Sequence, residues 1–475
     1  MAWRKIGGRV QGAAETNSGC PAVKAGRPQR FHGGLRTVIV TVAAVASTPA
    51  LAQTIQEEGG RIPGIPDPSI ASSLPEHLAD PGGLRSRLAK HGIQYGINYI
   101  GEVLGNPTGG IKQSAHYSGL LEVVVEADME KMIGWKGLTF FTNGYWIHGS
   151  SISVSNIGTL RPVSFIEALP STRLFELYLD QKLFDDKVSI RFGQLAADAE
   201  FLLSDGAGAF LNGTWGWPTI AAEDLPGSGP AYPLATPGVR LGLYPNDQTT
   251  LLVALYNGDP APPCGAVFAQ ICNKHGLDFE FNGPPLLFVE GAYKYHQGAG
   301  QLPGTIKLGG WNHFGNFEML RDPNRIVNGN YGLYAVIDQM IYRLPGEGDP
   351  KGISVFGRVI GAPSNRNLVD LYWEAGITFF GILPSRPDDI LGIGFGYVGI
   401  SSDEAARQRE EGEQITSNYG AGVEVAYTAE IVPGWYLQPD FQYFWNPGGR
   451  VADPDDPTKA IPNGSVIGLR TTINY

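Results

Sequence analysis

The sequence predicts an all-β fold: a transmembrane antiparallel β-barrel of about sixteen strands with a short N-terminal periplasmic helix. Three observations support this prediction. Only 17% of the 475 residues are charged, while 65 are Gly and 35 are Pro, which suits many short strands joined by turns. Apolar and polar residues alternate along most of the chain after Gly92, as expected of strands with one face in lipid and one in water. The last alternating segment ends on the aromatic Tyr475.

Residues 1–52 are expected to be a signal or targeting segment. Val38 to Ala46 form a short apolar core after a basic region, and Pro49 to Ala52 supply small residues for cleavage before Gln53. The mature chain would then have 475 − 52 = 423 residues. Outside this N-terminal region no run of 18 apolar residues occurs, so the sequence predicts no membrane-spanning helix.

Removal of the signal makes the chain more acidic. The whole chain carries 35 Lys and Arg and 46 Asp and Glu. Residues 1–52 hold seven basic residues and one acidic residue, which leaves 35 − 7 = 28 basic and 46 − 1 = 45 acidic groups, a net charge of −17. This balance argues against nucleic acid as a partner and against a channel dedicated to anions, whose lumen would be rich in Arg and Lys. Neutral or cationic solutes are expected instead.

The segment before the barrel is predicted in two parts. Residues 53–83 are rich in Pro, Gly and Ser without periodicity, which predicts an extended leader. Leu84 to Gly92 favour a short helix ended by the glycine, lying at the periplasmic mouth of a barrel that occupies residues 84–475 together with this helix.

Two cysteines remain after removal of the signal, Cys264 and Cys272. They lie in a loop-like stretch of an exported chain, so we expect a disulfide between them. The alternative is a two-thiolate metal site, which lacks nearby ligands beyond His275. No metal and no cofactor are expected.

About sixteen alternating segments follow Gly92. In one of them Val369, Leu371 and Trp373 alternate with Asp370 and Glu374. An even number of this size is typical of porins. Short gaps such as Asp185-Asp186 alternate with long ones such as 149–172 and 196–237. A soluble sandwich or propeller is the alternative, but no repeat of 40–50 residues is present. The predicted strands span residues 93–104, 117–130, 138–148, 173–184, 187–195, 238–245, 249–257, 286–296, 304–313, 331–343, 353–361, 369–381, 389–400, 419–430, 434–445 and 465–475.

Several stretches resemble one known family. The most specific are Arg191 to Phe201, Phe210 to Pro218 and Tyr232 to Arg240, which look like the OprB-type carbohydrate-selective porins of Gram-negative outer membranes. Later stretches with the same resemblance are Gly332 to Gln339, Ser385 to Asp389, Gln438 to Tyr443 and Asn446 to Gly449. The resemblance extends from about residue 80 to the end. One departure is Tyr475, where Phe is commoner in the family.

The resemblance implies a protein of the cell outer membrane, surrounded by outer-membrane lipid. Its lumen would be narrowed by inward-folded loops and would pass carbohydrate solutes, typically glucose or similar monosaccharides, by passive diffusion. It also implies that Tyr475 offers an aromatic carboxy terminus to the barrel-insertion machinery. The chain would be a monomer or a homotrimer.

Candidate pore-lining residues combine these motifs with the lumen phase of the alternation. Charged side chains suit sugar hydroxyl groups, and aromatic rings suit the C–H face of a sugar. The two tryptophans have an alternative interpretation as membrane-interface residues. The candidates are Arg191, Arg240, Asp338 and Arg358 on strands, and Asp198, Glu200, Trp215 and Trp217 on an inward-folded loop.

Other functions are less well supported by the sequence. An outer-membrane enzyme or a secreted glycosidase is the main rival class, but no Gly-x-Ser-x-Gly, His-Glu-x-x-His or phosphate-binding glycine loop occurs, and no catalytic residue is assigned. An adhesin or purely structural barrel would have a blocked lumen rather than a charged one. A general or cation-preferring porin is the closest alternative, because the net charge of −17 suits cations.

Overall fold

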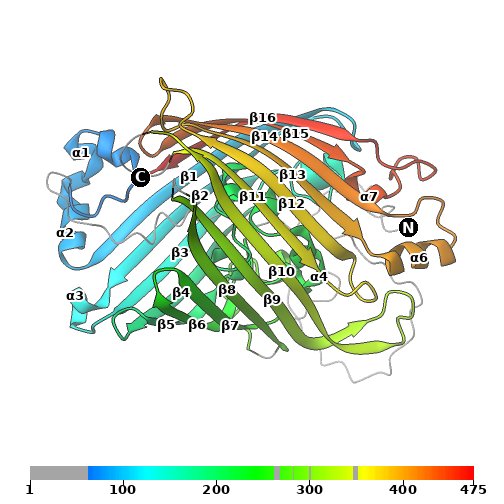
Figure 1. Cartoon of the computed structure of the whole chain (residues 1–475), viewed down its shortest axis with the longest axis horizontal. Helices are drawn as coiled ribbons and strands as arrows, with labels where there is room; N and C mark the ends of the chain where they lie inside the picture. The colour runs from blue at the N-terminus through cyan, green and yellow to red at the C-terminus, as the bar shows by residue number, and fades with distance from the viewer. Residues whose placement is uncertain (1–61, 262–267, 282, 299–300, 346–350) are drawn as a thin grey trace, which may run out of the picture.

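The computed structural model describes residues 62–261, 268–281, 283–298, 301–345 and 351–475. Within these residues, sixteen antiparallel strands form one closed barrel, in which β1 pairs with β16 and every other neighbour pair is consecutive in sequence (Figure 1). All sixteen predicted strands are confirmed; nine are longer than predicted, and the other seven have the predicted length or are one residue shorter. The strands are β1 (Ile93–Thr108), β2 (Ala115–Asp128), β3 (Leu138–Gly149), β4 (Ser171–Leu183), β5 (Val188–Leu195), β6 (Thr236–Asn246), β7 (Thr249–Asn257), β8 (Pro285–Gln297), β9 (Leu302–Glu318), β10 (Ile326–Arg343), β11 (Gly352–Gly361), β12 (Val369–Phe380), β13 (Ile390–Ile400), β14 (Tyr419–Val432), β15 (Trp435–Trp445) and β16 (Gly464–Asn474).

Short helices occupy the ends of the barrel and its interior. The predicted N-terminal helix is confirmed as α2, and Gly92 follows it with a φ of +83°. The helices are η3 (Ile70–Ser73), α1 (Glu76–Ala79), η4 (Pro81–Gly83), α2 (Leu84–Lys90), α3 (Met129–Ile133), η5 (Ser153–Ile157), η6 (Ala197–Ala199), η7 (Gly206–Ala209), η8 (Gly213–Trp215), α4 (Thr219–Asp224), η9 (Pro226–Ser228), α5 (Ala269–Cys272), α6 (Ser402–Glu410) and α7 (Pro447–Arg450). None of the helices in the described ranges is long and apolar enough to cross a membrane.

The leader differs from the extended chain predicted for residues 53–83. From Ile70 onward it forms three short helical turns, because Ser69 accepts a hydrogen bond from the Ala71 N–H and Pro75 starts the next turn. Turns of three or four residues are too short for a helical period to be detected in sequence. The predicted signal segment 1–52 and leader residues 53–61 lie outside the described residues.

The strands separate an apolar outer face from a polar inner face, as the alternation predicts. On β16, β11 and β10 the outward Leu469, Val359 and Leu333 are exposed. The inward Arg470 and Arg358, one residue away on β16 and β11, are buried in the lumen. The exposed apolar face is the one that a bilayer would cover.

The two ends of the barrel differ in their connections. Short turns join β4 to β5 and β6 to β7 at the end that carries α1, α2 and α3, whereas α6 and α7 lie at the opposite end (Figure 1). In outer-membrane barrels short turns are periplasmic and long loops extracellular. We therefore call these the periplasmic and extracellular ends.

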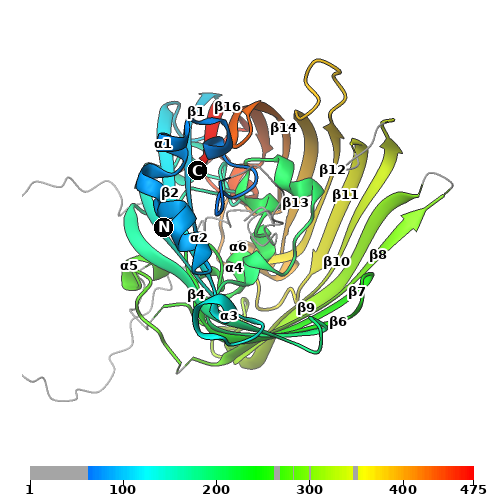
Figure 2. The same cartoon turned by 90° about the vertical axis from the view of Figure 1, so that its left-hand side faces the viewer.

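Two connections fold into the lumen instead of extending outward. We name residues 150–170 the first inward segment and residues 196–235 the second inward segment. Arg161 of the first segment donates hydrogen bonds to the carbonyls of Gly396 on β13 and Gly422 on β14, across the barrel from β3 and β4. The green helices of the second segment lie inside the ring of strands in Figure 2.

Glycines on β13 make room for these segments. Gly392, Gly394 and Gly396 recur at every second position, so all three face the lumen. A Cβ atom at these positions would lie 2.9 Å from the ring of Phe210, 2.6 Å from that of Trp215 and 2.7 Å from the Arg161 guanidinium, respectively. Side chains of the inward segments thus pack directly on the backbone of the barrel wall.

Candidate functional site

Three charged side chains form one row across neighbouring strands in the lumen. Asp180 on β4 is the register partner of Arg191 on β5, and Arg191 is the partner of Arg240 on β6. Directly opposed residues of adjacent strands point to the same face of a sheet. The hairpin between β4 and β5 therefore places a carboxylate beside the first guanidinium, and β6 adds the second.

Glu200, at the end of η6 in the second inward segment, completes this row from the lumen side. The Arg240 Nη2 lies 2.9 Å from the Glu200 Oε1 and 3.2 Å from the Asp180 Oδ2. The Arg191 Nη2 lies 2.9 Å from the same Asp180 oxygen, and its Nη1 lies 3.5 Å from the Glu200 Oε1. Ser189 donates its hydroxyl to Asp180 over 2.5 Å and accepts from Arg240 over 2.6 Å. We call Asp180, Arg191, Glu200 and Arg240 the charged cluster.

The members of the charged cluster differ in their access to the lumen. The side chains of Arg191, Glu200 and Asp180 are 17%, 15% and 12% exposed, whereas that of Arg240 is only 2% exposed. Arg240 therefore fixes the two carboxylates in place, and the other three present their free edges to solvent. Two carboxylates and two guanidinium groups balance, so the cluster as a whole is neutral.

An aromatic stack adjoins the charged cluster on the same face. The Arg191 guanidinium lies 4.2 Å from the ring centre of Tyr178 on β4. That ring stacks on Phe141 of β3, its register partner, with ring centres 4.7 Å apart. A cation over a tyrosine face is attracted by the ring quadrupole. The stack thus orients the guanidinium and extends the cluster with an apolar surface.

Four acidic side chains of the wall hold the second inward segment by its backbone. The carboxylates accept hydrogen bonds from N–H groups spaced along the segment. In chain order, these groups meet the wall at strands from β4 to β14. The pairs are Glu176 with Ala196, Glu290 with Leu202, Asp338 with Gly206, and Glu424 with Leu211 and Asn212. The predicted lining residue Asp338 is one of these holding groups, and it also accepts the Ser204 hydroxyl.

Arg358 and Trp215 belong to the same support. The Arg358 side chain is fully buried, donates to the carbonyls of Thr214 and Trp215 over 2.9 Å, and pairs with Glu374 at 2.7 Å. The Trp215 indole N–H donates to Glu424 over 2.6 Å, and its ring stacks on Phe210. These side chains anchor the inward segment and present no surface to the lumen.

Trp217 and Asp198 lie inside the second inward segment. The Trp217 ring is fully buried and its N–H donates to the Ser228 carbonyl over 3.0 Å. Asp198 accepts the Tyr232 N–H over 2.7 Å, and burial raises its pKa well above the usual range. Neither tryptophan lies at a membrane interface, so that alternative interpretation is wrong. Both lie within the packed segment inside the barrel.

One cysteine of the predicted disulfide lies within the described residues. Cys272 is disulfide-bonded, whereas Cys264 lies outside the described residues. Across the described ranges, no three His, Cys, Asp or Glu side chains are grouped as a metal site.

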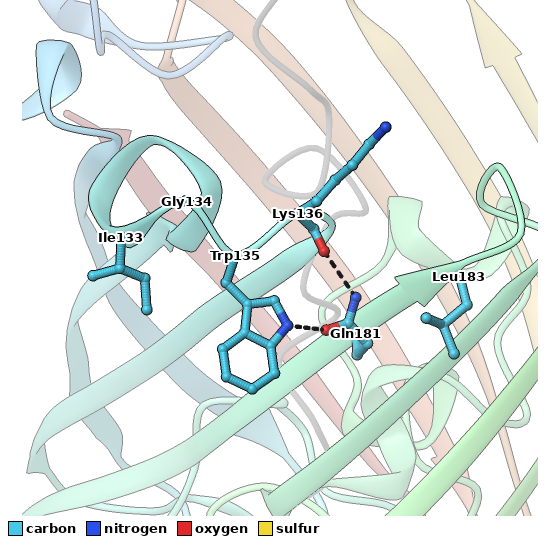
Figure 3. A pocket seen from close by; sticks show the side chains of 6 residues that line it. All are labelled: Ile133, Gly134, Trp135, Lys136, Gln181 and Leu183. Carbon is cyan, nitrogen blue, oxygen red and sulfur yellow. Dashed lines mark hydrogen bonds between the residues drawn. The ribbon is translucent and has the colours of Figure 1, made fainter.

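A surface hollow of about 710 Å³ lies away from the charged cluster. Figure 3 shows the Trp135 indole donating to the Gln181 side chain, over 2.7 Å, with Ile133 and Leu183 beside them. Gln181 and Leu183 alternate with the lumen-facing Asp180 on β4, so this hollow faces the outside of the barrel at its periplasmic end. It is therefore not on the path of a solute through the lumen.

The structure thus brings together three of the eight predicted lining residues, Arg191, Arg240 and Glu200. It adds Asp180, Ser189 and the stack of Tyr178 on Phe141. The alternation already places Asp180 on the lumen side, and the predicted turn at Asp185-Asp186 could have singled it out, because a hairpin closing there places residue 180 opposite residue 191. The stack could not be found in this way, because it depends on the pairing of β3 with β4 across a long connection.

Comparisons with known proteins agree with this architecture. The family model described as carbohydrate-selective porin, OprB family, matches residues 112–475. Porin B of Pseudomonas aeruginosa is 24% identical over 443 residues, covering 83% of this chain and 90% of that protein. The putative porin QuiX of Acinetobacter baylyi is 21% identical over 437 residues, covering 84% and 92%. The high-pH structure of Pseudomonas putida OprB superposes with a TM-score of 0.71 at 19% identity, covering 83% of this chain and 97% of that one.

Proposed function

This chain belongs to the OprB family of carbohydrate-selective porins of the outer membrane, and from that premise we propose that its charged cluster selects neutral monosaccharides such as glucose. The solutes cross by passive diffusion. Asp180, Arg191 and Glu200 contact them, and Arg240 holds the two carboxylates in position. The remaining predicted lining residues, Asp338, Arg358, Asp198, Trp215 and Trp217, act indirectly by fixing the inward segment that carries Glu200.

The observation that carries this proposal is the mutual pairing of two guanidinium groups with two carboxylates. A sugar hydroxyl both donates and accepts hydrogen bonds, so a row of paired donors and acceptors suits it. The cluster has no net charge, although the whole chain has a net charge of −11. A neutral row attracts neither anions nor cations strongly, which supports selection of uncharged solutes.

The aromatic stack supports the same solute class. Sugars present a C–H face on one side of the ring, which packs on aromatic surfaces. Phe141 and Tyr178 lie beside Arg191 on the lumen face, so a solute there meets polar and apolar surfaces together. Binding need only be weak, because conduction requires that the solute leave again.

A general or cation-preferring porin is the second candidate, and the acidic excess of the chain favours it. It makes a different prediction, because a channel of that kind would conduct ions without regard to sugar. The proposed partners are carbohydrate solutes, outer-membrane lipid around the exposed apolar face and, through Tyr475, the barrel-insertion machinery. Monomer and homotrimer both remain predictions.

The test is single-channel current of the refolded mature protein in a planar bilayer. We expect glucose to reduce the current saturably, a disaccharide to do so less, and a simple anion not to compete. The Arg321→Gln variant, which changes an exposed residue paired with Glu410 at the extracellular end, should behave like the native chain. Current indifferent to every sugar would support the general porin instead.

A further inference from the structure

The first described residues of the chain fold over its last residue. We name residues 62–92, which contain η3, α1, η4 and α2, the clasp. Figures 1 and 2 show α1 and α2 beside the carboxy terminus at the periplasmic end of the barrel. The clasp therefore lies on the pairing of β1 with β16, which we call the seam.

Arg85 on α2 is the centre of this contact. Its side chain is 1% exposed although it lies in a segment at the mouth of the barrel. The guanidinium carbon lies 4.2 Å from the ring centre of Tyr95 and 4.8 Å from that of Tyr475. Its Nη1 donates to the carbonyls of Gly64 and Tyr95, both over 2.9 Å. One buried cation thus joins the clasp to β1 and to the end of β16.

The hydroxyl, the ring and the backbone of Tyr475 all form contacts within the chain. Its hydroxyl donates to the Leu78 carbonyl in α1 over 2.7 Å. Its backbone N–H and carbonyl exchange hydrogen bonds with Ile97 of β1 over 2.8 and 2.9 Å. Ser69 of the clasp reaches the neighbouring Asn474 carbonyl over 3.3 Å. The hydroxyl, the backbone and the ring face toward Arg85 are thus engaged within the chain, and the residue is half-buried.

Two glycines permit the close approach of the clasp. Gly64 has a φ of +83°, and a Cβ atom there would lie 2.9 Å from the Ala89 Cβ. Gly434, in the turn between β14 and β15, has a φ of +81°, and its Cβ would lie 2.3 Å from the Ile70 N. The clasp therefore fits the finished barrel on both the β1 side and the β15 side of the seam.

The seam differs from the other strand pairs of the barrel. Each other pair joins strands that are consecutive in sequence, whereas the seam pairs residues such as Tyr99 and Ile473, which are 473 − 99 = 374 positions apart. Closing so long a loop is entropically the most costly pairing. Until it closes, β16 has an unpaired edge that can pair with another protein.

We propose that the clasp is a release device: it folds onto Tyr475 once the seam has paired and so withdraws this residue from the barrel-insertion machinery. The inference rests on the proposed engagement of Tyr475 by that machinery. The two contacts compete, because the hydroxyl, the backbone and the ring face toward Arg85 are used within the chain. A clasp that cannot close would leave the barrel attached to its insertion partner.

The test follows pulse-labelled full-length chain in cells and measures how long it co-purifies with the insertion machinery. Arg85→Ala removes the buried cation, and we expect the bound chain to persist several-fold longer than the native chain. Arg87→Ala is the matched control, because this residue lies on the same helix, is exposed, and bonds within the clasp to the carbonyls of Gly82 and Gly83. It should be released at the native rate.

Two further measurements separate the possible outcomes. Pure phospholipid vesicles contain no barrel-insertion machinery, so Arg85→Ala should refold into them with the native yield. Failure in vesicles would overturn the proposal, since Arg85 would then serve stability alone, and so would release of the variant from the machinery at the native rate. Tyr475→Phe keeps the ring and loses only the hydroxyl's bonds to the Leu78 and Ala79 carbonyls, so a smaller delay is expected. Tyr475→Ala tests the engagement itself: native assembly of that variant would refute the engagement separately from the clasp.

Discussion

Arg191 and Arg240 share both of their carboxylate partners, but only Arg191 has a free edge toward the lumen. Arg191→Gln leaves the cluster with one guanidinium and two carboxylates, a local charge of −1. We expect a shift toward cation permeability in the reversal potential under a salt gradient. Loss of a charge-assisted hydrogen bond of about 1.5 kcal/mol would weaken glucose block roughly tenfold.

Glu200→Gln is the opposite change at the same site. It leaves a local charge of +1, so the reversal potential should shift toward anions while glucose block weakens similarly. Shifts of the same sign in both variants would contradict the neutral cluster as the selective element. The pair of variants thus controls for general damage to the lumen.

Glu167 provides a pH-dependent position in the first inward segment. It accepts the hydroxyls of Ser151 and Ser153 and the Ile152 N–H, and burial raises its pKa from about 4.5 to about 7. The folded segment therefore holds a proton that the unfolded chain releases. Its stability is greatest below about pH 4.5 and falls as the pH rises to about 7.

Hydrogen exchange of the backbone amides in η5 at pH 5 and pH 8 tests this expectation. In the native chain, protection should be lower at pH 8, whereas Glu167→Gln should remove the dependence on pH. Glu76→Gln, on the exposed side of α1, is the control. Equal protection of the native chain at both pH values would contradict the argument.

For single residues, the sequence predicted which side chains face the lumen better than it predicted whether they contact solute. The alternation correctly placed Arg358 and Asp338 inside the barrel. It could not indicate that Arg358 is covered by carbonyls of Thr214 and Trp215, because those contacts join residues more than 140 positions apart. Trp215 and Trp217 were expected to face solutes, and instead their rings fill the space between the inward segment and the wall.

Among the elements, β13 shows how a strand can be specialised for an internal partner. Its lumen face is a run of alternating glycines against Phe210, Trp215 and Arg161. Gly394→Val would add a side chain 2.6 Å from the Trp215 ring. We expect an overpacking cost of about 1–3 kcal/mol, seen as a lower temperature of heat modification on gels and noisier single-channel current.

Gly291→Val on β8 is the matched control for this substitution. A Cβ there would meet nothing within 4 Å, and the position alternates with the lumen-facing Glu290. The control should keep the native transition temperature and a quiet current. Equal destabilisation by the two variants would mean that valine harms strands in general rather than the packing of Trp215.

The strands were predictable because apolar and polar residues alternate within each of them, a pattern that can be recognised in a short segment alone. The turns of the clasp and the path of the second inward segment were not, because their short helices have no detectable period and their backbone groups are held by distant carboxylates. The alternating glycines of β13 are visible in sequence, and they are a local signal for close internal packing.

For the whole molecule, we expect the barrel to close without the second inward segment that fills its lumen. Leu195 and Thr236 are already register partners, so residues 197–234 can be replaced by a four-residue turn without stretching the wall. We expect a folded barrel with several-fold higher conductance and no glucose block, since Glu200 is lost. Exposure of inward apolar residues such as Phe356 and Tyr334 should lower its thermal stability.

Conductance and heat modification measured on the same preparation check this prediction. A folded variant with native conductance would show that the second inward segment does not narrow the lumen. Closure itself followed from sequence, because an even set of amphipathic strands without a soluble repeat has few other solutions. The neutrality of the cluster did not follow, because net charge says nothing about which charges meet.

The distribution of roles around the wall has a consequence for protein engineering. Contacts with solute are proposed on β4, on β5 and at Glu200 of the second inward segment, whereas β8 to β14 supply most of the bonds that hold that segment. A library of variants at Asp180, Arg191 and Glu200 would therefore sample new permeants without revisiting the residues that secure assembly. Such a scaffold suits directed evolution of a nanopore sensor. We expect the variants to differ in the solute they detect while their barrels still fold.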